Sequence, residues 1–158
     1  RKSGRHNRQA LLVEDDDPNK TLMQRFNDEE VMEILKLSNA TRLETGEFLF
    51  KKGEAGDYMY ILLSGDVEVI IGEDNSITIS GNQTILGELA FFEQKERTAS
   101  IKALTDISVI FISREDYKVL EDTQPKIVLK LLKELVKVLA ARLRNVDEVL
   151  IEVTHKNS

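Results

Sequence analysis

Between residues 41 and 113 the chain alternates short apolar clusters with glycines, and this rhythm restricts its fold more than any other feature. The clusters lie at residues 48–50, 58–63, 67–71, 77–79 and 107–112, and the glycines between or beside them are Gly46, Gly53, Gly56, Gly65, Gly72 and Gly81. Runs of this length are typical of strands, and glycine accommodates tight turns. Short strands at regular spacing predict an antiparallel barrel, sandwich or roll, because a parallel sheet would need crossover helices between its strands.

Helical patterns flank this β region on both sides. Asn27 or Asp28 is suited to cap a helix whose apolar residues recur at helical spacing, and we expect Asn39 to end that helix. After the β region, Ser113 is suited to cap a short helix, and Pro125 favours the start of another. The predicted fold is therefore mainly β with flanking helices: an antiparallel, jelly-roll-like β-roll with an N-terminal helix and C-terminal helices.

The last predicted helix carries more apolar residues than one buried face needs. They recur at spacings of three or four and include Val128, Leu131, Leu132, Leu135, Val138, Leu139, Leu143, Val146, Val149, Leu150 and Val153. A helix of this kind can pack partly on the roll and partly on a second copy of itself. We therefore expect a homodimer through residues 125–153, and a stripe that serves only as core is the alternative.

Composition limits the possible partners and the compartment. The chain has 28 acidic and 22 basic residues and a net charge of -6, which disfavours direct binding to nucleic acid or to anionic lipid. It has no Cys and no apolar run long enough to cross a bilayer, so we expect a cytoplasmic protein without a membrane segment. The expected domains are a polar tail or linker at 1–26, a folded domain at 27–153 and a tail at 154–158. Because the chain begins with Arg1, we expect a fused effector domain to lie outside it.

Residues 87–92 interrupt the strand pattern inside the β region. Glu88, Leu89, Ala90 and Phe92 are compatible with one short helical turn, whose first N–H groups have no partner within the turn. Such groups bind anions, Gly87 permits a close backbone approach, and Arg97 adds a planar fork of donors. The segment therefore predicts a phosphate-binding loop with a short helix.

Two stretches of this region carry a family resemblance. The first is Gly87-Glu88-Leu89-Ala90 followed by Arg97-Thr98-Ala99, with the arginine ten positions after the glycine; the second is KKGEAGDYMYILLSGDVEVI, which contains the turn glycines Gly53 and Gly65. The chain resembles the cyclic-nucleotide-binding domain family, which includes the catabolite activator protein, regulatory subunits of cyclic-nucleotide-dependent kinases and cyclic-nucleotide-gated channels. The compound motif is far more specific than a lone glycine-rich loop.

The resemblance implies a ligand and a role for each motif residue. Arg97 would pair with the cyclic phosphate, and Glu88 would accept a hydrogen bond from the ribose 2′-hydroxyl. Backbone amides from Gly87 through Leu89 to Ala90 would share the phosphate, and Ala99 is the remaining ligand-binding residue of the motif. Val69 and Leu86 match the positions beside the base, and the last helix would close over it. Thr98 follows the arginine, where a threonine is associated in the family with cGMP. We rank cAMP above cGMP as the regulatory ligand because the last helix is similar to those of bacterial members.

Other interpretations remain open at this point. Glu88 and Arg97 are also compatible with an exposed ion pair, and Lys95-Glu96, where many relatives have a small residue or proline, with a roll that has lost its ligand. Such a roll would serve only for interaction or dimerisation. The chain is also compatible with the sensor half of a transcription regulator. An enzyme is disfavoured, because the two histidines, His6 and His155, lie near the termini and no nucleophile or phosphate-loop motif is present. No metal is expected.

Overall fold

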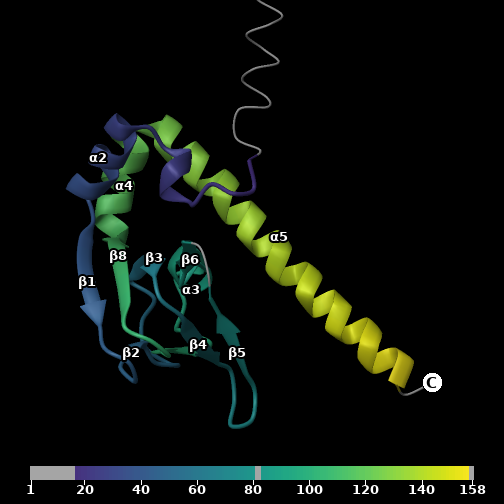
Figure 1. Cartoon of the computed structure of the whole chain (residues 1–158). Coiled ribbons are helices and arrows are strands. Elements are labelled where there is room, and N and C mark those ends of the chain that lie inside the picture. The colour runs from purple at the N-terminus through teal and green to yellow at the C-terminus, as the bar shows by residue number, and fades with distance from the viewer. Residues whose placement is uncertain (1–16, 81–82, 157–158) are drawn as a thin grey trace, which may run out of the picture.

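The computed structural model describes the backbone of residues 17–80 and 83–156, and the side chains of residues 17–80 and 83–145. A 3-10 turn η1 (Met23–Arg25) and helix α2 (Asp28–Lys36) precede the β region. Its strands are β1 (Asn39–Leu43), β2 (Phe48–Phe50), β3 (Tyr58–Ser64), β4 (Val67–Ile70), β5 (Ser76–Ile79), β6 (Thr84–Leu86), β7 (Ser100–Ala103) and β8 (Ile107–Ser113). Helix α3 (Glu88–Glu93) lies between β6 and β7, and α4 (Arg114–Thr123) and α5 (Pro125–Lys156) follow β8 (Figure 1).

The strands form two antiparallel sheets, with the orders β1-β8-β3-β6 and β2-β7-β4-β5. The predicted fold, an antiparallel β-roll with flanking helices, is thus confirmed. Side chains of a strand alternate between its two faces, so β3 and β8 each contribute to two apolar clusters. Leu62 and Val109 lie in the cluster inside the roll, whereas Ile61 and Ile110 lie in the cluster beneath the helices. The roll therefore encloses one apolar core, and a second apolar cluster lies between the roll and the helices.

The N-terminal region is more structured than the sequence indicates. Asn27 caps α2 in a capping box with Glu30, but the helix ends at Lys36, and Asn39 begins β1 rather than ending the helix. Leu22 and Phe26 lie within the stretch predicted to be a linker, yet both are buried in the cluster beneath the helices. That part of the linker prediction is wrong, because these two large apolar side chains pack in the hydrophobic core.

Helix α5 has two apolar faces. Val128, Leu131 and Leu135 are buried against the roll, as the predicted stripe requires. In contrast, Leu129, Leu132, Val136 and Leu143 are exposed, and each lies three, four or seven positions after the one before it. Val146, Val149, Leu150 and Val153 lie outside the described side chains. The helix continues to Lys156, beyond the predicted domain end at residue 153.

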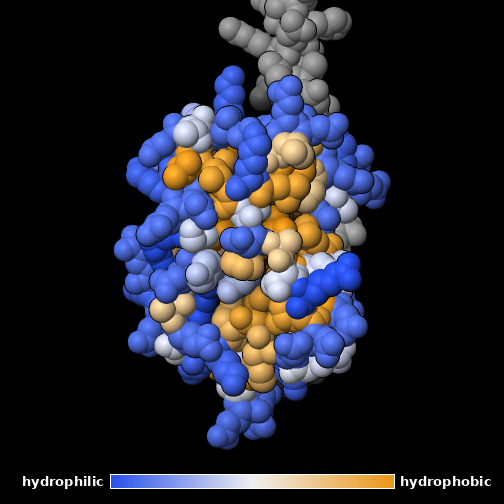
Figure 2. Space-filling model, turned by 90° about the vertical axis from the view of Figure 1, so that its left-hand side faces the viewer, coloured by the Kyte–Doolittle hydropathy of each residue, from blue (hydrophilic) through white to orange (hydrophobic). Residues whose placement is uncertain are grey.

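Another face of the molecule also exposes apolar groups. Figure 2 shows the side on which α2, β1 and α4 lie in Figure 1, and hydrophobic residues gather along its middle within a hydrophilic border. Exposed apolar side chains on these two helices include Met32, Leu35 and Val119. Among the described residues, no helix is both long and apolar enough to span a membrane.

Candidate functional site

A cavity of about 290 Å³ opens between the roll, α3 and α5. All nine site residues predicted from the sequence line it: Val69, Leu86, Gly87, Glu88, Leu89, Ala90, Arg97, Thr98 and Ala99. Six lining residues were not predicted: Phe50, Ile71, Ile77, Ile79, Ile101 and Arg142. The structure therefore brings strands β4 to β7, the predicted loop and the last helix together at one cavity.

Gly87 determines how the chain enters α3. Its φ of +73° is left-handed, a conformation that glycine adopts without strain. A Cβ at this position would lie 2.6 Å from Nη1 of Arg97, so a larger residue would also displace the guanidinium. After this glycine the chain forms the short helix that the sequence predicts, with Glu88 and Ala90 buried. Gly87 thus allows the loop and Arg97 to approach closely.

Arg97 lies beneath the loop, and its side chain is only 4% exposed. Its Nη1 donates to the carbonyl of Gly87 at 2.6 Å, its Nη2 donates to the carbonyl of Tyr58, and its guanidinium carbon lies 4.1 Å from the ring centre of Phe50. The Nε atom is buried and has no hydrogen-bond partner among the described residues. Burial lowers the pKa of Arg97, and nearby Tyr60 and Glu88 oppose that shift. Because a guanidinium stays protonated in proteins, Arg97 brings a buried positive charge to the cavity.

Glu88 is also 4% exposed, and its partner comes from α5. Nη1 of Arg142 donates to Oε1 of Glu88 at 2.7 Å, and Nη2 of Arg142 donates to the carbonyl of Ile85 at 2.7 Å. The interpretation of Glu88 and Arg97 as an exposed ion pair is wrong, since both are buried and no ion pair joins them among the described residues. Arg142 was missed, although it follows Leu131, Leu135 and Val138 at the spacing of the roll-facing side of the helix.

The other residues singled out in the sequence differ in their exposure and in whether they line the cavity. Leu86 and Ile101 are buried, so they offer fixed apolar surface, while Thr98 lies at an exposed part of the lining. Lys95 and Glu96 are exposed and do not line the cavity. These two positions therefore contribute no side chain to the lining. No cluster of side chains that could hold a metal ion occurs in residues 17–80 and 83–145.

A known family model matches the part of the chain that forms the roll and the loop. Residues 40–123, just over half of the chain, match the family model described as cyclic nucleotide-binding domain. The chain belongs to the cyclic nucleotide-binding domain family. The matched residues of this chain cover the roll, α3 and α4, whereas α5 lies beyond them.

Relatives of this cyclic nucleotide-binding domain occur in proteins of different kinds. A CRP-like cAMP-activated global transcriptional regulator from Mycobacterium tuberculosis is 31% identical over 112 residues, which cover 68% of this chain and 48% of the regulator. The cGMP-dependent protein kinase 2 of Mus musculus is 30% identical over 96 residues, which cover 61% of this chain and 12% of the kinase. The chain thus spans from about an eighth to about half of the length of these relatives.

A solved structure agrees with the sequence matches. The catabolite activator protein of Thermus thermophilus superimposes with a TM-score of 0.66 at 27% identity, over 84% of this chain and 62% of that protein. The similarity therefore extends over more of this chain than the family model covers.

Proposed function

We propose that this domain is a non-catalytic regulatory module that binds a cyclic nucleotide, cAMP or cGMP, in the cavity beside α3. One observation carries the proposal: Glu88 and Arg97 are the only charged residues in the described part of the chain that are almost completely buried, and both line that cavity. Burying a charge is costly unless it is paired, so two such residues at one opening indicate a site that binds a polar ligand.

The chemistry of a cyclic nucleotide fits the unmet needs of these side chains. A phosphate oxygen would accept a hydrogen bond from Nε of Arg97, the buried donor that lacks a partner in the described residues. In the same part of the chain Glu88 is bound through Oε1 alone, which leaves Oε2 to accept a hydrogen bond from a ribose hydroxyl. Val69 and Leu86 supply apolar surface for the purine. Each part of the ligand thus has a matching group.

We place cAMP ahead of cGMP because the last helix is similar to those of bacterial members, and Thr98 keeps cGMP open as the alternative. Thr98 lines the cavity next to Arg97, and its hydroxyl would bind a guanine amino group in a cGMP complex. The relatives do not favour one ligand, since the regulator from M. tuberculosis is cAMP-activated and the mouse kinase is cGMP-dependent. Measured affinities for the two ligands decide between them.

We further propose that Arg142 couples the ligand to α5. Arg142 binds the carboxylate that the ribose would share, and it also contacts the carbonyl of Ile85 on the strand that leads into the loop. Its positive charge offsets the repulsion between Glu88 and a phosphate anion. Ligand and helix therefore stabilise the same carboxylate, so that binding favours the arrangement in which α5 lies against the cavity.

A homodimer through α5 is the second part of this proposal. The exposed Leu129, Leu132, Val136 and Leu143, with the partly buried Leu139, occupy the a and d positions of successive heptads, which is the pattern of a two-stranded coiled coil. The same stripe favours an interaction module as the alternative function, because it offers a contact surface that needs no ligand.

Light scattering after gel filtration tests the dimer. We expect the unaltered chain to have twice the 18.0 kDa mass of one copy, and Leu143→Glu to shift it toward 18.0 kDa by placing a charge in the seam. Asn145→Glu is the control, because it adds the same charge to an exposed position of α5 outside the a and d positions. A monomeric unaltered chain contradicts the dimer but leaves ligand binding untouched.

Isothermal titration calorimetry with cAMP, cGMP and cyclic di-GMP tests the regulatory function. We expect saturable binding of one of the two mononucleotides at one site per chain. Thermal melting supplies a second readout, since a ligand at 100 times its dissociation constant adds about 2.7 kcal/mol to the free energy of unfolding. The absence of both heat and stabilisation at millimolar ligand, in a chain that still dimerises, would leave the interaction module as the function.

A further inference from the structure

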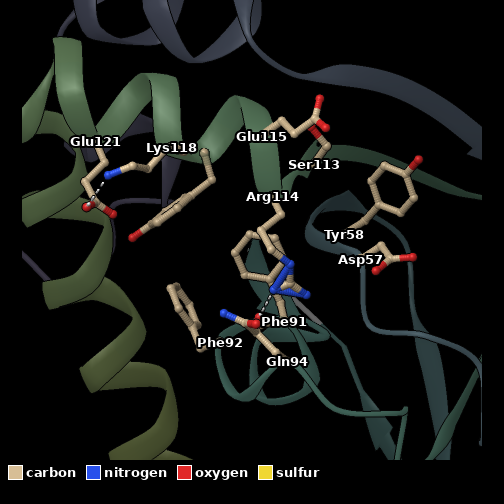
Figure 3. Close-up of a pocket in the computed structure, with 11 residues that line it drawn as sticks. Asp57, Tyr58, Phe91, Phe92, Gln94, Ser113, Arg114, Glu115, Lys118 and Glu121 are labelled. Atoms are coloured by element: carbon tan, nitrogen blue, oxygen red, sulfur yellow. Dashed lines mark hydrogen bonds and ion pairs between the residues drawn. The ribbon is translucent and has the colours of Figure 1, made fainter.

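Arg114 is the first residue of α4, and its side chain reaches back to α3 (Figure 3). Its Nη1 donates to the carbonyl of Phe91 at 2.7 Å and its Nη2 donates to the carbonyl of Gly56 at 2.7 Å. The guanidinium carbon lies 5.0 Å from the ring centre of Phe91, as a cation–π contact requires. Arg114 does not line the cavity proposed for the ligand. Its guanidinium group is therefore used to hold the protein's own backbone.

The carbonyl of Phe91 needs such a donor. In a longer helix it would accept from the N–H of Lys95, but that N–H donates to the carbonyl of Ala90 at 3.1 Å. The last carbonyls of a helix must find partners outside it. Arg114 is thus the partner that ends α3, and it comes from a different helix.

Arg97 and Arg114 hold α3 in the same manner at its two ends. Each arginine divides its two terminal nitrogens between α3 or its N-cap and the segment 56–58, where β3 begins. Arg97 donates to the carbonyls of Gly87 and Tyr58, and Arg114 donates to those of Phe91 and Gly56. The segment lies directly against the helix, because a Cβ on Gly56 would lie 2.5 Å from Cβ of Ala90. Two forks therefore fix a six-residue helix that has few hydrogen bonds of its own.

A second contact from α4 acts on the same part of α3. The ring of Tyr117 meets those of Phe91 and Phe92 edge to face, with centroids 5.5 Å apart in each case. Arg114 and Tyr117 lie one turn apart on α4, so both project toward α3. A displacement of α4 would break the fork and the ring contacts together, and α5 begins directly after α4.

We propose that Arg114 is a positioning residue for the ligand site, because it fixes the C-terminal end of α3 from a different helix. The inference rests on the proposed function, because α3 carries the loop residues assigned to the phosphate. A ligand bound at the loop would hold α3 in the position that Arg114 also favours, so loss of Arg114 should weaken binding without removing any contact to the ligand.

Calorimetry with cAMP and cGMP on the unaltered chain and four variants tests this role. We expect Arg114→Ala to weaken binding about 10-fold, as the loss of charged hydrogen bonds from a supporting group implies. Arg114→Lys keeps the charge but not the planar fork of donors, so its affinity for the nucleotide should lie between that of the unaltered chain and that of Arg114→Ala. Ile34→Val, a buried change on α2, controls for a general loss of stability, and Lys118→Ala controls for the loss of an exposed charge on α4.

Hydrogen exchange of the ligand-free chains gives a readout that does not depend on binding. Amides of residues 88–95 should exchange about 10-fold faster in Arg114→Ala than in the unaltered chain. In Ile34→Val the same amides should exchange at the rate of the unaltered chain, even if this variant lowers the melting temperature as much as Arg114→Ala does. Unchanged exchange in Arg114→Ala, or an equal loss of affinity in Ile34→Val, overturns the inference. If the unaltered chain binds neither nucleotide, the proposed function fails, and the exchange of α3 still decides whether Arg114 positions it.

Discussion

Residues of α3 line two hollows, and the larger hollow lacks the buried charges of the smaller one. The cleft between α3 and α4 has a volume of about 930 Å³, against about 290 Å³ for the cavity in the roll. The cations of the large cleft are engaged. Arg114 donates to the carbonyls of Phe91 and Gly56. The exposed Lys118 pairs with Glu121, as Figure 3 shows, and also with Asp122. The small cavity instead holds two buried opposite charges, Glu88 and Arg97. Buried charge at an opening, rather than the larger volume, therefore identifies the candidate ligand site.

Arg97→Ala should have the largest effect on this contrast. We expect affinity for the cyclic nucleotide to fall on the order of 100-fold, because the phosphate would lose its buried positive partner. The variant also removes two bonds to carbonyls, so melting temperature must be measured beside calorimetry. Arg97→Lys should restore part of the affinity by restoring the charge. An Arg97→Ala chain that folds and binds as tightly as the unaltered chain would contradict the assigned site.

This strongest prediction depends on residues that the sequence identifies without a structure. Eight of the nine predicted residues lie at one cavity because they belong to one local stretch, residues 86–99, which contains the glycine, the short helix and the arginine; Val69 comes from β4. The bonds of Arg97 to the carbonyls of Gly87 and Tyr58 carry no signal in the sequence, because every residue has a carbonyl. Local motifs thus predict which residues gather but not which backbone groups hold them.

Long-range contacts account for most of what the sequence misses. The ion pair between Arg142 and Glu88 joins residues 54 positions apart, and it exists only because α5 passes the cavity. Strand β1 (Asn39–Leu43) was not predicted, because all of its residues except Leu43 are exposed and no apolar alternation marks it. Its pairing with β8 supplies the order that its own side chains do not. Strands with a weak apolar pattern and the paths of long helices are therefore the parts that need a structure.

A pair of matched carboxylates sharpens the comparison of the two hollows. We expect Glu88→Gln to weaken binding about 10-fold, because an amide is a poorer acceptor for the ribose and loses the ion pair to Arg142. Glu115→Gln makes the same chemical change at the large cleft, and we expect less than about 2-fold, because Glu115 is exposed there. Calorimetry compares the two. Equal effects of both changes would mean that burial of the carboxylate does not distinguish the hollows.

The helix that closes the small cavity should contribute less than the loop. Arg142→Ala is expected to weaken binding about 3-fold to 10-fold, since the ion pair is only partly screened from water and the loop contacts remain. Arg144→Ala, an exposed arginine on the same helix, is the control and should bind like the unaltered chain. A spin-label distance between α5 and β5 supplies the second readout. Tighter binding in Arg142→Ala would mean that Arg142 competes with the ligand for Glu88.

Thr98 should give the smallest change, but one that acts on a single ligand. Its hydroxyl is at the exposed part of the lining and belongs to neither buried charge, so removing it leaves the phosphate and ribose contacts in place. We expect Thr98→Ala to weaken cGMP about 3-fold, the effect of one neutral hydrogen bond, and to leave cAMP unchanged. Thr98→Ser keeps the hydroxyl and is the control. If cAMP weakens as much as cGMP, the hydroxyl serves the phosphate instead of the base, and the choice between the two ligands must come from another wall of the cavity.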